Sequence, residues 1–281
     1  MIIASVVVPA HDEAAVITRC LRALAEGADG ELDVIVVANG CRDDTAAAAK
    51  RAGATVVETP VAGKTNAIRL GDAQCQVFPR LYLDADSELT GTAVRTMIAA
   101  LAQAGVPAAA PTPVFDLSPM SRPARGFYRA LHALTGDRRG LSGTGAYLLT
   151  EAGHARVFPL PDVIADDAWV HRTFAPDERL VVGTVTAPVR LAHTVPAVIR
   201  RRARVRLGNR QLAEFGRPAT EPPLRPKALV ALVRGGRVGP VDAACFLGVL
   251  AAERVLARWR GLRGRADTWS SDSTARSEGA A

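Results

Sequence analysis

Short apolar runs alternate with amphipathic stretches along the first two thirds of the chain. Residues 2–8 form a continuous β-branched run, the pattern of a strand covered on both faces. Residues 14–25 then place their apolar side chains on one helical stripe. The same patterns predict further strands at 32–38, 55–58, 81–83, 107–111, 146–149 and 181–189, and helices at 45–52, from about 64 to 76, 90–104, 125–134 and 167–174. This alternation predicts an α/β fold with a parallel sheet flanked by helices.

The C-terminal part of the chain changes to helical and Pro-rich patterns. We expect a basic helix at 198–215 and a second helix at 241–262. Predicted domain bounds are therefore 1–215 for the α/β domain, 216–265 for a Pro-rich linker with an amphipathic helix, and 266–281 for a disordered tail. The longest charge-free run of the second helix has too few residues to cross a bilayer. It predicts a helix that either packs on the domain or lies at a membrane surface.

Charge divides the chain in the same place. Residues 1–189 hold 17 Lys and Arg against 21 Asp and Glu, whereas residues 190–265 hold 17 against 4. A segment this basic favours an anionic partner, namely substrate phosphates, a lipid surface or nucleic acid. No aromatic residues interleave with the arginines of 200–206, so we expect no nucleic acid.

Cysteine usage and the first residues indicate the compartment. Four cysteines lack C-x-x-C spacing, which argues against a disulfide framework or a zinc site and favours a reducing cytosol. The apolar N-terminus has no basic leader, so it predicts a buried strand instead of a signal peptide. The expected location is cytoplasmic, with the inner face of the membrane as an open alternative.

Two acids follow the predicted strand at 81–83. In a strand, residues i and i+2 point to the same face, so Asp84 and Asp86 are expected to project together. Neighbouring carboxylates repel unless a cation or hydrogen-bond donors neutralise them. Oxygen ligands of this kind suit Mg²⁺ or Mn²⁺, with water and substrate phosphate completing the shell. The pattern predicts a metal and diphosphate site, with a turn that caps the next helix through Asp86 or Ser87 as the alternative.

Other polar clusters follow other predicted strands. They are Pro9–Glu13, Asn39–Thr45, Gly63–Asn66, Gly140–Gly145 and Asp166–Asp167. In open α/β sheets, ligands bind at the carboxyl ends of the strands. The clusters therefore predict one ligand site along that edge.

The order and spacing of these motifs over residues 3–210 resemble the family 2 glycosyltransferases of GT-A fold. The matching segments are 6–13 (VVVPAHDE), 36–45 (VVANGCRDDT), 63–64 (GK), 84–86 (DAD), 143–145 (GTG) and 166–167 (DD). The resemblance implies a Rossmann-like, mostly parallel sheet flanked by helices, here with a C-terminal helical appendage. It also implies transfer of a sugar from a nucleoside diphosphate sugar to an acceptor hydroxyl, with a divalent metal and inversion at the anomeric carbon. The acceptor stays open and includes lipid-linked molecules, with peripheral membrane contact as an expectation.

The resemblance further implies a role for individual residues. Nucleotide binding is expected from Pro9, Ala10, Glu13, Asn39, Lys64 and Asp84. Asp86 and His193 are expected to bind the metal, and Arg201 and Arg204 the diphosphate, with Arg202 and Arg206 as the alternative pair. Acceptor binding is expected from Gly143, Thr144, Asp166 and Trp169, and Asp167 matches the general base. The first acid of the family's pair is commonly Glu and here is Asp166, which is shorter.

Several of these residues have a structural alternative. Asn39 stands where many family members have Asp, and an amide can both donate and accept. Asp43 is expected to buttress the Asn39 loop or to cap the helix that follows. Lys64 follows Gly63 at a helix start, where it meets either a phosphate or solvent. Trp169 forms an acceptor wall or joins the core, and His193 is a ligand or a structural residue.

Three classes of function compete. A glycosyltransferase is the first. A sugar-1-phosphate nucleotidyltransferase would need a Gly-rich basic loop after the first strand, and Pro9–Glu13 is acidic. A non-catalytic module that binds nucleotide sugar or an anionic surface is the third. An oxidoreductase is not favoured, because no G-x-G-x-x-G follows the first strand.

Overall fold

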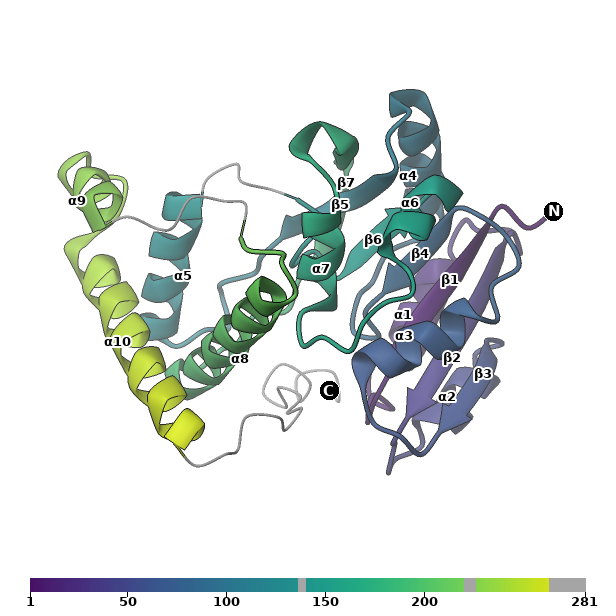
Figure 1. The fold of residues 1–281 in the computed structure, drawn as a ribbon, viewed down its shortest axis with the longest axis horizontal. Coiled ribbons are helices and arrows are strands. Elements are labelled where there is room, and N and C mark those ends of the chain that lie inside the picture. The colour runs from purple at the N-terminus through teal and green to yellow at the C-terminus, as the bar shows by residue number, and fades with distance from the viewer. Residues whose placement is uncertain (136–139, 220–225, 263–281) are drawn as a thin grey trace. The chain divides into compact units, whose positions relative to one another are not determined.

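The computed structural model describes residues 1–135, 140–219 and 226–262 (Figure 1). These residues form two compact units. The first, called the sheet unit, comprises residues 1–114 and 140–189. The second, called the helical unit, comprises the described residues of 115–135 and 190–262.

The sheet unit is built on seven strands. They are β1 (Ala4–Ala10), β2 (Leu32–Asn39), β3 (Thr55–Thr59), β4 (Arg80–Leu83), β5 (Ala108–Val114), β6 (Ala146–Leu149) and β7 (Arg179–Pro188). Their order in the sheet is β3-β2-β1-β4-β6-β5-β7. β6 runs antiparallel to β4 and β5, and the other neighbouring strands are parallel. The predicted α/β fold with a mostly parallel sheet is confirmed.

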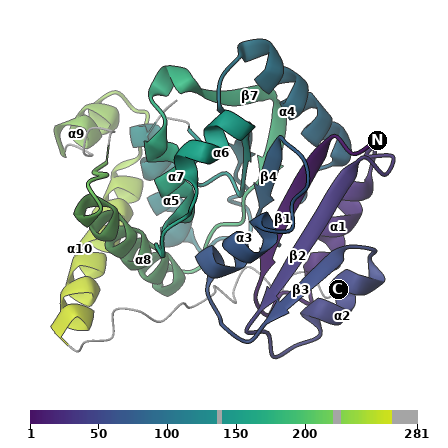
Figure 2. The same ribbon diagram turned by 45° about the vertical axis from the view of Figure 1, so that its right-hand side comes forward.

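Helices cover both faces of this sheet (Figure 2). One face carries α1 (Ile17–Ala25), α2 (Thr45–Arg51) and α4 (Gly91–Ala104), and the other carries α3 (Lys64–Asp72), α6 (Glu151–Val157) and α7 (Asp166–Thr173). A short 3-10 helix, η1 (Pro176–Glu178), precedes β7. Alternate strand residues enter the two cores: Val6 and Val8 pack under α1, whereas Val7 packs under α3. Burial on both faces explains the unbroken apolar runs of the central strands.

Two helices were not predicted. α6 has only seven residues and begins where Thr150 accepts a hydrogen bond from the backbone N–H of Gly153 at 3.0 Å. Such a short helix gives too little periodicity to detect. The other, α9 (Pro226–Arg234), follows the predicted Pro-rich linker.

The helical unit consists of α5 (Arg122–Thr135), α8 (Val195–Glu214), α9 and α10 (Pro240–Leu262) (Figure 1). α10 packs along α5 and α8, and the rings of Phe127 and Phe246 stack with centroids 5.5 Å apart. Because α5 and α8 pack with α10, the predicted boundary at residue 215 does not coincide with the observed division. The predicted tail at 266–281 lies outside the described residues. In the part of the chain that is described, no helix is long and apolar enough to span a bilayer.

Candidate active site

The two acids that follow β4 lie in a turn. The strand ends at Leu83, and the backbone N–H of Ser87 donates to the Asp84 carbonyl at 3.0 Å. Neither acid is in the strand, so strand alternation does not orient them, and the joint projection of Asp84 and Asp86 stays a prediction. The Asp84 N–H donates to the Gly145 carbonyl at 2.8 Å, which fixes this turn against the Gly-rich loop before β6.

Lys64, the first residue of α3, lies between two carboxylates. Its Nζ is 2.8 Å from Asp84 Oδ1 and 3.1 Å from Asp166 Oδ1. Burial by itself lowers the pKa of the Lys64 ammonium, but Asp166 and Asp84, with Asp167, raise it more, so the net shift is upward. Lys64 is thus held as a cation. It joins the acid after β4 to the acid that opens α7.

Asp166 is more deeply buried than its neighbour in sequence. Its side chain is 5% exposed, and its Oδ2 has no hydrogen-bond partner among the described residues. Burial raises the pKa of the Asp166 carboxyl, the Lys64 ammonium opposes this, and the charges of Asp167 and Asp84 add to the rise, which is the net direction. One ammonium therefore serves more than one carboxylate.

Tyr147, on β6, belongs to the same cluster and was missed from the sequence. Its ring stacks on Tyr82 of β4 with centroids 5.0 Å apart, and within the described structure its buried hydroxyl has no hydrogen-bond partner. Burial and the charge of Asp166 raise the pKa of this hydroxyl. The sequence signal that could have identified Tyr147 is its position two residues after the Gly-rich loop. The Tyr147 hydroxyl and Asp166 Oδ2 are thus two buried polar atoms of the same cluster without a hydrogen-bond partner in the part of the chain that is described. Such groups are unusual, and they point to a missing partner.

Asp167 is half-buried and is oriented by two backbone groups. The N–H of Gly143 donates to its Oδ2 at 2.7 Å, and the N–H of Ala168 donates to its Oδ1 at 2.7 Å. A carboxylate has about four acceptor positions, so each oxygen keeps capacity for a further hydrogen bond. The Gly-rich loop thereby orients the predicted base.

Gly145 shows why this loop needs glycine. Its φ is 72°, and a Cβ there would lie 2.5 Å from Ser87 Oγ and 4.0 Å from Asp84 Oδ2. Neighbouring Thr144 is 1% exposed, and its hydroxyl donates to the Ala146 carbonyl at 2.6 Å. These bonds give Thr144 a role in shaping the loop, and its contact with an acceptor stays a prediction.

The predicted nucleotide loops are tied together by Asn39, at the end of β2. Its Nδ2 donates to the Ala10 carbonyl at 2.7 Å, and its Oδ1 accepts from the Gly63 N–H at 3.0 Å. The side chain is fully buried. Asn39 therefore joins the carboxyl ends of β1 and β2 to the start of α3, and its contact with a base stays a prediction.

Asp43 has the structural role expected for it. It accepts from the N–H groups of Ala14 and Thr45 at 3.0 Å each. Partial burial alone raises the pKa of this carboxyl, but hydrogen bonds from Thr45 and Ala14 lower it more. Thr45 Oγ1 in turn accepts from the Glu13 N–H at 2.8 Å, so Glu13 is placed at the same edge of the sheet.

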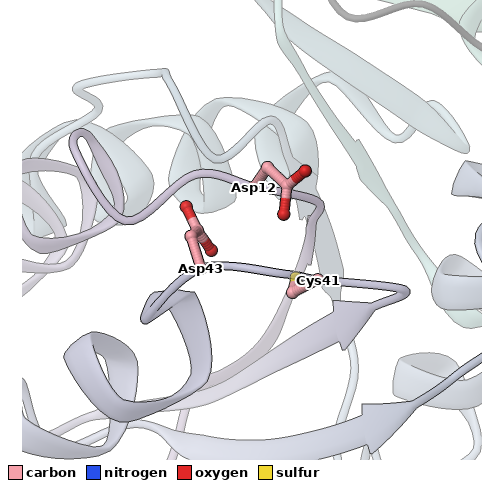
Figure 3. Close-up of side chains that lie close together, drawn as sticks. All are labelled: Asp12, Cys41 and Asp43. Atoms are coloured by element: carbon pink, nitrogen blue, oxygen red, sulfur yellow. The ribbon is translucent and has the colours of Figure 1, made fainter.

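Asp12, Cys41 and Asp43 also lie close together (Figure 3). Their ligand atoms are all within 4.8 Å of one another, but the Arg42 N–H donates to Asp12 Oδ1 at 2.7 Å, and Asp43 has the bonds given above. Burial raises the pKa of the Cys41 thiol, which opposes formation of a thiolate ligand. These contacts account for the cluster as part of the loop.

Trp169 is oriented toward the core. Its Nε1 donates to the Val157 carbonyl at 3.3 Å, and its ring packs on the core beneath α6 and α7. The core alternative is thus supported, and acceptor contact stays a prediction.

The remaining predicted site residues belong to the helical unit. The carbonyl of His193 accepts from the Ser121 N–H at 3.0 Å, and Arg201 donates to the Arg190 carbonyl at 2.9 Å. The alternative pair, Arg202 and Arg206, instead binds the buried carboxylate of Glu253 on α10. Because Asp86 and His193 fall in different units, their joint role in metal binding stays a prediction, as does diphosphate binding by Arg201 and Arg204.

The fold and the acidic edge of the sheet define a class of enzyme. Residues 5–146 match glycosyl transferase family 2, and the chain belongs to this family. The matched span runs from the second residue of β1 to the first residue of β6 and contains Asn39, Lys64, Asp84 and Asp86. The chain is therefore a glycosyltransferase by class, which decides against the nucleotidyltransferase and the non-catalytic module.

Solved structures with the same fold include two kinds of sugar transferase. Glucosyl-3-phosphoglycerate synthase from Mycobacterium tuberculosis, in complex with phosphoglyceric acid, is 22% identical, with a TM-score of 0.56 over 77% of this chain and 81% of that one. The mannosyltransferase PcManGT from Pyrobaculum calidifontis, in complex with GDP-Man and Mn²⁺, is 19% identical, with a TM-score of 0.56 over 92% and 79%. A search of curated proteins finds no match.

Proposed function

We propose that this chain is an inverting glycosyltransferase that uses a divalent metal and a nucleoside diphosphate sugar, with Asp167 as the general base. One observation carries the proposal. Three carboxylates and one ammonium, from the turn after β4, the start of α3 and the start of α7, meet at the carboxyl edge of the sheet. In such folds, this edge is where ligands bind.

A divalent cation fits the residues after β4. Asp84 is 40% exposed and Lys64 contacts its Oδ1, while its Oδ2 lies on the side of Gly145, which carries no side chain. Asp86, two residues on, adds carboxylate oxygens. An all-oxygen donor set suits Mg²⁺ or Mn²⁺, and the mannosyltransferase structure holds Mn²⁺ with its donor. The ion would supply positive charge that offsets the negative charge of a departing diphosphate.

Asp167 is the better base of the two acids that open α7. An acceptor hydroxyl is a weak nucleophile until its proton is removed as the new bond forms. Asp166 is buried and paired with Lys64, whereas Asp167 is half-buried and aimed by the N–H groups of Gly143 and Ala168. Removal of the proton by Asp167 would let the hydroxyl attack opposite the leaving diphosphate, with inversion.

Lys64 is proposed to have a structural role in this site, and its contact with a nucleotide phosphate stays a prediction. Both of its contacts are carboxylates, so its role in the proposal is to hold Asp84 and Asp166 in place. The loops at Pro9–Glu13 and Asn39 are proposed to take the nucleoside. The identity of the donor sugar and that of the acceptor, which includes lipid-linked molecules, must be found by experiment.

The first experiment is a panel of nucleotide sugars with Mn²⁺ or Mg²⁺, read by thermal stabilisation and by release of nucleoside diphosphate. We expect one donor to stabilise the protein only when metal is present. With that donor, Asp167→Asn is expected to slow transfer by about 10² to 10⁴-fold while donor affinity is kept.

Asp177→Asn is the matched control, since Asp177 lies exposed on η1. It should leave transfer unchanged. Equal turnover by Asp167→Asn and the parent would contradict the assignment of Asp167 as the general base. Absence of any donor that binds in a metal-dependent way would contradict the proposed function.

A further inference from the structure

The outward face of α10 is apolar where a solvent-facing helix is normally polar. After Pro240, its exposed residues in the part whose burial is described are Val241, Ala244, Leu247, Gly248, Ala251, Arg254, Val255, Arg258 and Trp259. Val241 is 74% exposed, Val255 68% and Leu247 54%. At 3.6 residues per turn these positions form one continuous arc of about 140°, about 27 Å long. Four large apolar side chains therefore face outward along one stripe.

The same face carries positive charge and no acid. The only acids of α10 are Asp242 and Glu253. Glu253 is fully buried against Arg202 and Arg206, and Asp242 lies half-buried, 4.0 Å from Arg129 and close to Gly126. Among the α10 residues whose burial is described, Arg254 and Arg258 are thus the charged residues of the exposed arc.

Neighbouring α9 repeats this chemistry. It packs against α5 and α10, and its exposed positions include Lys227, Val230 and Arg234. Val230 is 49% exposed. Lys227 and Arg234 therefore add positive charge on α9 to that of Arg254 and Arg258 on α10. The charge around the apolar stripe therefore complements an anionic surface.

We infer that the exposed face of α10 docks onto an anionic lipid bilayer, with the helix lying in the plane of the interface. Its apolar side chains would enter the boundary between headgroups and acyl chains, while Arg254 and Arg258 meet lipid phosphates and Trp259 sits at headgroup depth. This inference needs neither the donor nor the metal, so it stands apart from the proposed function.

Charge also argues against the other occupants. A parallel two-fold pairing of this face with a second copy would bring arginines together without an acid to offset them. A nucleic acid would meet the arginines but would leave Val241, Leu247 and Val255 exposed to water. A lipid surface accommodates both the apolar stripe and its cations, and the other occupants are outcomes of the test below.

The test is co-sedimentation of the full chain with vesicles of phosphatidylglycerol and phosphatidylcholine, compared with phosphatidylcholine alone. The parent is expected to bind the anionic vesicles and to lose binding at high salt. Leu247→Asp and Val255→Asp should each weaken binding by about tenfold or more, since each buries a carboxylate in the interface. Arg254→Gln with Arg258→Gln should weaken it without loss of apolar area.

Val61→Asp is the matched control. Val61 is 59% exposed in the sheet unit, so this change adds the same charge and removes a similar apolar side chain. It should leave binding unchanged, and melting curves should show all variants folded. Failure of the parent to bind anionic vesicles would overturn the inference. An equal loss of vesicle binding in Val61→Asp would also overturn the inference. The same holds if sedimentation equilibrium shows a dimer that Val255→Asp dissociates.

Discussion

The two units each bury one ion between two ions of the opposite sign. In the sheet unit, the Lys64 ammonium lies between Asp84 and Asp166. In the helical unit, the Glu253 carboxylate lies between Arg202 and Arg206. Each arrangement links separate elements: the turn after β4, α3 and α7 in the first, and α8 and α10 in the second.

The two clusters differ in what they leave unsatisfied. Both oxygens of Glu253 accept a guanidinium hydrogen bond, so that cluster is complete. In the sheet unit, Asp166 Oδ2 and the Tyr147 hydroxyl are buried and lack partners in the described structure, and Asp84 is 40% exposed. Buried polar groups are normally satisfied, so an incomplete cluster indicates a site for a ligand, whereas a complete one indicates scaffolding.

Removing the charge of Glu253 should have the largest effect on stability. Glu253→Gln leaves two guanidinium groups beside a neutral side chain that is fully buried. We expect a loss of about 3 kcal/mol in the free energy of unfolding, with donor binding unchanged. Glu214→Gln, an exposed position on α8, makes the same chemical change as a control and should have little effect. Denaturant unfolding measures both, and equal stabilities would show that the cluster is not scaffolding.

Lys64→Met should lower the free energy of unfolding somewhat less than Glu253→Gln does, and it should also impair the active site. It leaves Asp84 and Asp166 without their cation, but Asp84 is 40% exposed, so we expect about 2 kcal/mol. Donor affinity should fall as well, in contrast to Glu253→Gln. The control is Lys50→Met, which removes an exposed pair with Glu58. Adding Asp166→Asn to Lys64→Met should restore stability but not turnover, and failure to restore stability would argue against the pairing.

The smallest effect is expected from an exposed pair, Arg156 with Glu178. The hydrogen bond from Arg156 and that from the Ala175 N–H lower the pKa of Glu178 from 4.5 to about 2. Because the folded-state pKa is depressed, the stabilisation is present above pH 4.5 and is lost as the pH falls through about 2. Thermal unfolding across this range should show a weaker acid dependence in Glu178→Gln. An identical profile would show that the pair contributes nothing.

The sequence allowed the sheet and its polar edge to be predicted because both signals are local. Apolar runs such as residues 2–8 mark strands buried on both faces, and acids such as Asp84 follow directly on a strand. The pairing of Lys64 with Asp166 could not be predicted, since it joins residues far apart in the chain. The pairing of Glu253 with Arg202 and Arg206 could not be predicted for the same reason. This pairing joins α8 to α10 within the helical unit. Nothing local distinguished Arg202 from Arg201.

The central claim is that the acids after β4 bind a divalent ion that in turn binds the donor diphosphate. Titration calorimetry of the identified nucleotide sugar, with Mn²⁺ or with a chelator, tests it most directly. We predict binding that requires Mn²⁺ in the parent and in Asp167→Asn, and that is lost in Asp86→Ala. Donor binding of equal affinity in the chelator, or in Asp86→Ala with Mn²⁺, would contradict the claim.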